Sequence, residues 1–129
     1  MPRRTIEAFR AERATGQEAL LAADHLGIRR FLRLDSATYE DGALPGRTKE
    51  LLGLVASAVL RCNDCIDYHL EQCVALGYSK DEIVDALNVA LVVGGSIVIP
   101  HARHAMLSLD ELLVERAAER ARAAADAAE

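Results

Sequence analysis

Two cysteines and a histidine lie close together in the segment CNDCIDYH, residues 62–69. In a helix, at about 100° per residue, Cys62, Cys65 and His69 would lie within about 60° of one another on one face. Two thiols at this spacing can close a disulfide, and a histidine four residues after a cysteine can take the proton that keeps it a thiol. The segment therefore predicts thiol redox chemistry, which needs both kinds of group.

A buried, unreactive helix face is the alternative interpretation of the same residues. This face continues through Ile66, Leu70 and Cys73, and Asp64 and Asp67 are expected on the opposite, solvated face. Buried cysteine usually behaves as a small hydrophobic residue, which is the interpretation that we prefer for Cys73. Two cysteines at CxxC spacing, with a histidine in register, nevertheless favour chemistry for the other three side chains.

Metal binding is a weaker hypothesis. Cys62 and Cys73 would lie about 16 Å apart along a helix, too far for ligands that share one tetrahedral zinc with bonds of about 2.0–2.3 Å. The other candidate ligands, His101 and His104, have an unusual spacing, and histidines near a helix end usually face solvent or are structural. We therefore expect neither a metal nor another cofactor.

The composition favours an intracellular catalyst, which we place in the cytoplasm. A chain of 129 residues predicts a single domain over residues 1–129, and a net charge of -5 gives no basic surface for nucleic acid. An odd number of cysteines, three, suits a reducing compartment. No apolar signal segment follows the N-terminus, and the longest apolar stretch, residues 83–100, is interrupted by Asp85, Asn88 and two glycines. We therefore expect no export signal and no membrane partner.

Helical periodicity accounts for most of the chain and predicts an all-α fold of about six helices. Residues 1–34 should contain two helices, residues 35–46 a loop, and residues 47–60 a helix that precedes the CxxC helix. The CxxC helix should end at Gly77, and Ser79 and Glu82 form a capping box for the next helix. A last helix should start near Pro100 and continue into a marginally stable tail, residues 110–129.

The stretch from Leu44 to Leu109 resembles the carboxymuconolactone decarboxylase-like, or alkylhydroperoxidase D-like, family. The matching residues are RTKELL at 47–52, the CxxCxxxH motif at 62–69, and ALGYSKDEI at 75–83 with Ala86 and Leu87. The resemblance places the family core at residues 47–109 and implies a compact helical domain that forms a homo-oligomer, from dimer to hexamer. The decarboxylases of the family lack the CxxC pair, so the motif indicates the redox branch.

In peroxidase-type members a glutamate, both cysteines and the histidine form a proton-relay site, and the resemblance assigns these roles to Glu50, Cys62, Cys65 and His69. Without the resemblance, Glu50 would be interpreted as a solvated charge in the first turn of a helix. On a helical wheel it shares a side with Leu54 and Ser57 that leads toward Cys62.

The predicted function is a thiol-dependent peroxidase or disulfide oxidoreductase with a hydroperoxide substrate and a dithiol electron donor, such as a thioredoxin-like or lipoyl protein. Cys65 would be the attacking thiolate and Cys62 the resolving thiol, although the helix N-terminus could reverse these roles. Two other classes stay open: a lyase that uses Glu50 and His69 without the thiols, and a non-catalytic helical oligomer with a redox-sensing cysteine pair.

Overall fold

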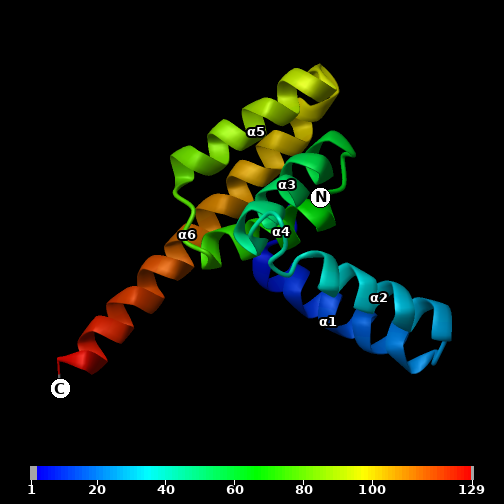
Figure 1. Cartoon of the computed structure of the whole chain (residues 1–129). Coiled ribbons are helices and arrows are strands. Elements are labelled where there is room, and N and C mark those ends of the chain that lie inside the picture. The colour runs from blue at the N-terminus through cyan, green and yellow to red at the C-terminus, as the bar shows by residue number, and fades with distance from the viewer. Residues whose placement is uncertain (1–2, 129) are drawn as a thin grey trace. The chain divides into compact units, whose positions relative to one another are not determined.

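Helix signals in the sequence and the helices of the structure agree closely. The computed structural model describes residues 3–128, and these contain six α-helices and a short 3-10 helix, with no strand (Figure 1). The prediction of an all-α fold is therefore confirmed. Within the described residues, no helix combines the length and the hydropathy needed to cross a membrane.

The described chain forms two compact units, the first ending at Lys49 and the second beginning at Glu50. In the first unit, α1 (Ile6–Ala22) and α2 (Leu26–Thr38) contact each other and are joined by a tight turn (Figure 1). The side chain of Thr5 accepts a hydrogen bond from the backbone of Ala8 and so caps α1. The Nδ1 atom of His25 does the same for α2 by accepting from the backbone N–H of Gly27, at 3.1 Å.

The loop that follows is shorter than the sequence predicted, because α2 continues through Asp35 to Thr38. The Thr38 hydroxyl donates to the carbonyl of Leu34 at 2.7 Å, so this polar side chain is hydrogen-bonded within the last turn of α2. Lys49 then donates to the carbonyls of Thr38 and Glu40 and ties the loop to the start of α3 (Gly46–Val59).

In the second unit, α4 (Asn63–Ala75) packs along α6 (Ile99–Ala127), and this is the most extensive contact between two helices in the described chain. The helix α5 (Lys80–Gly94) begins with the predicted Ser79–Glu82 capping box and is joined to α6 by η1 (Ser96–Val98). The core of this unit is apolar, with Leu54, Ala58, Ile66, Leu70, Cys73, Ile83, Ala90, Val98, Ala105 and Leu109 almost fully buried. Burial of α4 on more than one side fixes its rotation, and α4 carries the CxxC motif.

Candidate functional site

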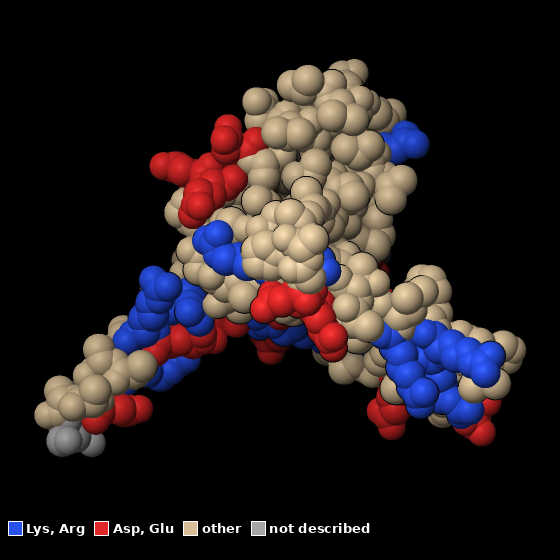
Figure 2. Space-filling view, in the orientation of Figure 1, with Lys and Arg blue, Asp and Glu red and all other residues tan. Residues whose placement is uncertain are grey.

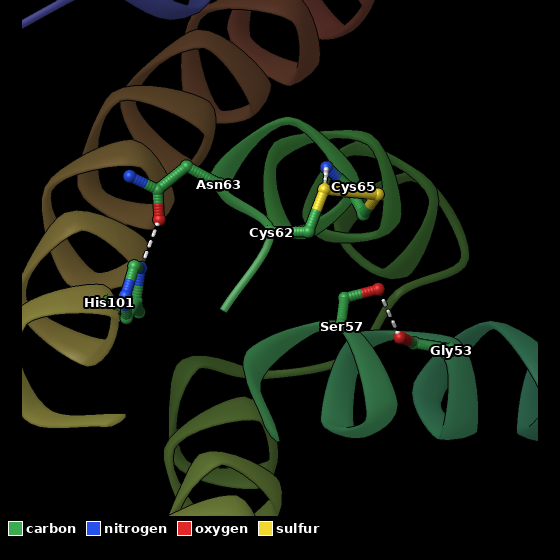
Figure 3. Close-up of a disulfide and its surroundings, with 6 residues drawn as sticks. All are labelled: Gly53, Ser57, Cys62, Asn63, Cys65 and His101. Atoms are coloured by element: carbon green, nitrogen blue, oxygen red, sulfur yellow. Dashed lines mark hydrogen bonds between the residues drawn. A yellow bond between two sulfur atoms is a disulfide. The ribbon is translucent and has the colours of Figure 1, made fainter. Parts of the chain in front are cut away.

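The helix α3 carries a buried carboxylate on its inner face. Glu50 is only 8% exposed and shares this face with the buried side chains of Leu54 and Ser57, as the helical wheel predicted. The Ser57 hydroxyl on the same face donates to the carbonyl of Gly53 at 2.6 Å (Figure 3), so it is hydrogen-bonded within the helix.

A sharp turn joins α3 to α4 and presents the cysteines at a helix start. Arg61 takes a left-handed conformation with φ 61°, and the backbone N–H of Cys62 then donates to the carbonyl of Ser57. This geometry closes α3 and directs the chain into α4. Cys62 becomes the N-cap residue of α4, and its Sγ accepts a hydrogen bond from the backbone N–H of Cys65 at 3.3 Å.

Cys62 and Cys65 form a disulfide across the first turn of α4, with their Cα atoms 5.3 Å apart (Figure 3). This separation lies in the usual range for a disulfide. Cys65 is exposed and Cys62 is half-buried, whereas Cys73 is fully buried and lies outside the disulfide. The predicted pairing, with Cys73 as a core residue, is confirmed.

Glu50 and His69 form a buried hydrogen-bonded pair that links α3 to α4. The Nδ1 atom of His69 donates to Oε2 of Glu50 at 2.8 Å, and His69 is also only 8% exposed. With Nδ1 carrying this proton, Nε2 is the ring nitrogen that can accept or release a second one. His69 follows Cys65 by one turn of α4, so a proton acceptor held by a carboxylate lies on the same helix as the cysteine pair.

Gly53 makes room for this pair, a role that was not predicted from the sequence. A β-carbon at position 53 would lie 2.6 Å from Cε1 of His69 and 2.8 Å from Nε2. The imidazole therefore packs directly against the backbone of α3, one turn after Glu50. Tyr68 meets the same imidazole edge-on, with the two ring centroids 5.2 Å apart.

Asp67 does not lie on a solvated face, and that expectation is wrong. It is 1% exposed, and its Oδ1 accepts from His104 Nε2 at 2.9 Å and from Ser108 Oγ at 2.7 Å. The helix α6 covers this side of α4, so the aspartate is buried where Oδ1 meets two donors from α6. Asp64, in the first turn of α4, is exposed as expected.

The other histidine of α6, His101, also contacts α4. Its Nδ1 donates to Oδ1 of Asn63 at 2.8 Å, and Asn63 stands between the two cysteines in the sequence (Figure 3). His101, His104 and Ser108 are spaced three and four residues apart, which places them on one face of α6. From this spacing in the sequence, a polar face of α6 that contacts α4 could have been predicted. No group of three or more histidine, cysteine or acidic side chains in the described residues is arranged to hold a metal ion.

Known proteins resemble this chain in sequence and in fold. Residues 28–108 match the carboxymuconolactone decarboxylase family. The chain is 33% identical over 82 residues to uncharacterised protein 4 of the cox locus of Paracoccus denitrificans, a match that covers 64% of this chain and 74% of the relative. An uncharacterised protein of Cupriavidus necator is 26% identical over 94 residues, covering 73% of this chain and 83% of that protein.

Two solved structures are similar over most of their length. A carboxymuconolactone decarboxylase family protein of Thermotoga maritima is 51% identical with a TM-score of 0.81, and the match covers 86% of this chain and 94% of that one. A family protein of Legionella pneumophila, 24% identical with a TM-score of 0.77 over 83% of this chain and 96% of its own, shares the fold. By the match over residues 28–108, the chain belongs to the carboxymuconolactone decarboxylase family.

Proposed function

We propose that this protein reduces a hydroperoxide with electrons from an external dithiol, and that Cys62 and Cys65 cycle between the dithiol and the disulfide. The main support is the disulfide at an exposed helix start, followed one turn later by the buried Glu50–His69 pair. A role in an antioxidative response has been suggested for the Thermotoga maritima relative, which agrees with this chemistry.

The cycle begins with the reduced pair. His69 accepts the proton of the Cys65 thiol, and the thiolate attacks one peroxide oxygen. The O–O bond breaks, Cys65 becomes a sulfenic acid, and the other oxygen leaves as an alcohol, or as water from hydrogen peroxide, with the proton that His69 returns. Glu50 accepts the Nδ1 hydrogen bond throughout and stabilises the imidazolium.

Formation of the disulfide completes the reduction of the peroxide. The sulfur of Cys62 attacks the sulfenic sulfur of Cys65, the S–O bond breaks, and the hydroxyl leaves as water with the Cys62 proton. A donor dithiol, which we propose to be a thioredoxin-like or lipoyl protein, then attacks the exposed sulfur and forms a mixed disulfide. Its second thiol resolves that bond, so the donor leaves as a disulfide and both cysteines regain their hydrogens.

A lyase is the second candidate, and one observation favours it. The Glu50–His69 hydrogen bond does not involve either cysteine, so the carboxylate–imidazole pair could act in a reaction that does not use the thiols. Such a pair could move protons on a small lactone or keto acid. Turnover of such a substrate that survives substitution of both cysteines would identify this class.

The test is peroxide consumption by the purified protein with a panel of dithiol donors. We expect turnover in the native protein, none in Cys65→Ser, and nearly native turnover in Cys73→Ser, whose buried thiol lies outside the disulfide. Equal activity in Cys65→Ser and the native protein, or no turnover with any donor, would contradict the proposed peroxidase.

A further inference from the structure

We propose that His101 is a positioning residue for the cysteine pair, and that its hydrogen bond to Asn63 makes the Cys62–Cys65 disulfide easier to reduce. The inference rests on the proposed function in one respect, namely that the pair cycles between its two redox states. His101 belongs to α6, and it acts through a neighbour of the sulfurs (Figure 3).

Asn63 lies at the very start of α4. Asn63 is the first residue of the helix and directly follows its N-cap, Cys62. The hydrogen bond from His101 Nδ1 to Asn63 Oδ1, 2.8 Å long and partly buried, anchors this residue to another helix. The first turn of a helix otherwise tends to fray, because its N–H groups have no partner within the helix.

The first turn of α4 interacts directly with the sulfur of Cys62. Its Sγ accepts the backbone N–H of Cys65 at 3.3 Å, so this N–H of the first turn points toward sulfur. In the reduced protein the Cys62 sulfur, whenever it ionises, would face the same N–H and the positive end of the helix dipole. An anchored first turn keeps the Cys65 N–H and the helix dipole directed at the Cys62 sulfur. This stabilises the Cys62 thiolate and hence the reduced form of the pair. A disulfide whose reduced form is stabilised has a higher reduction potential.

The two histidines of α6 provide a matched comparison. Both donate to α4, but His104 contacts Asp67, which lies one turn farther along the helix and follows both cysteines, whereas Asn63 lies between them in the sequence. If the histidines only hold α6 against α4, loss of either should affect stability alone. If the position of Asn63 matters, only loss of His101 should change the redox equilibrium.

The experiment measures the thiol–disulfide equilibrium of the full chain in dithiothreitol buffers, with the reduced fraction read by alkylation and mass. We expect His101→Leu to lower the equilibrium constant for reduction about three- to tenfold, where tenfold equals about 30 mV. His101→Gln, whose amide can still donate to Asn63, should stay within about twofold of the native value. His104→Leu should reduce the urea midpoint of unfolding and leave the redox constant within the same twofold range.

A double-mutant cycle separates this contact from other effects. Asn63→Ala should shift the constant in the same direction as His101→Leu, and the double variant should shift it no further than the larger single change. Additive shifts, an unchanged constant in both single variants, or an equal shift in His104→Leu would overturn the proposal. The thiol–disulfide equilibrium is measured without peroxide, so it can be interpreted even if the protein shows no peroxidase activity. Equally, an unchanged equilibrium constant would not bear on the peroxidase assay.

Discussion

The proposed proton chemistry depends on one nitrogen of His69. Its Nδ1 is hydrogen-bonded to Glu50, so Nε2 is the atom that could accept the thiol proton of Cys65. We expect His69→Gln to slow the reaction of the reduced protein with peroxide about 10²–10⁴-fold at neutral pH, the usual cost of losing a general base. The loss should shrink as the pH rises, because the thiol then ionises without help.

Single-turnover thiol oxidation against pH would measure this effect. Glu50→Gln should give a smaller loss in the same direction, because its amide oxygen can still accept from Nδ1 while the negative charge is gone. Unchanged rates in His69→Gln would falsify the relay and leave the histidine as a buried structural residue.

The space at Gly53 yields a second prediction for the same imidazole. In Gly53→Ala, the added methyl group would come within 2.6 Å of the ring, so the ring must move relative to Glu50. A displacement of about 1 Å can cost up to about 10²-fold in rate, and we expect a loss of about tenfold or more in single-turnover oxidation.

The control is a glycine-to-alanine substitution at a helical position where the added methyl group meets no other atoms. Gly16 also lies in a helix, and a β-carbon there would have no neighbour within 4 Å. Gly16→Ala should stabilise the protein by up to about 1 kcal/mol in urea unfolding through helix propensity, and it should leave the oxidation rate unchanged. Equal rates for the two variants would show that the ring is free to shift.

Among the helices, the packing of α4 against α6 depends on a buried aspartate. Loss of Asp67 would leave His104 and Ser108 without their shared acceptor inside the packed contact. We expect Asp67→Ala to reduce the free energy of unfolding in urea by about 2–4 kcal/mol, the range for removing one member of a buried polar network. Asp64→Ala, an exposed aspartate of the same helix, should cost less than about 1 kcal/mol. Similar losses for the two variants would contradict the burial of Asp67.

The sequence predicted features that depend on neighbours along the chain and missed those that depend on another helix. The CxxC helix, its end at Gly77 and the Ser79 capping box are local patterns, and all were predicted. Asp67 was misassigned because its partners lie 37 and 41 residues away, on a helix whose register against α4 no local pattern specifies.

In the candidate site, too, some features were predicted from the sequence and others depend on contacts between helices. The face of α3 that carries Glu50 followed from helical periodicity, and its pairing with His69 followed from the family resemblance. Gly53 gave no signal, because its role is the space that it leaves for an imidazole from α4. The Asn63–His101 contact was unpredicted for a similar reason, since the rotation of α6 is set by packing along its length.

At the scale of the whole molecule, an uncharged surface supports the proposal that the protein is a homo-oligomer. Residues 86–100 contain no acidic side chain, lysine or arginine, and exposed apolar side chains lie there on α5, namely Val89, Val92 and Val93, and on η1, namely Ile97. In Figure 2 acidic side chains gather where α5 begins, and the visible face beyond them is largely uncharged. A contiguous apolar surface of this kind is typical of a protein interface.

A second copy of the chain is the partner that we propose for this surface. We expect light scattering at micromolar concentration to give a mass between dimer and hexamer, and Val92→Glu to shift it toward the monomer because a charge would be buried at the contact. Ala118→Glu, on the exposed last part of α6, is the matched control and should keep the native mass. A native protein that is monomeric, or a Val92→Glu variant with the native mass, would count against this interface.

The hydrogen bond between Glu50 and His69 has a consequence for how such proteins diversify. It joins two helices through a carboxylate and an imidazole, and neither sulfur takes part in it. Exchange of the two cysteines at the exposed start of α4 would therefore leave the buried acid–base pair in place. One ancestral scaffold can thus give rise to descendants with and without electron transfer, and the reaction type can change during evolution at two surface-accessible positions while the interior stays the same.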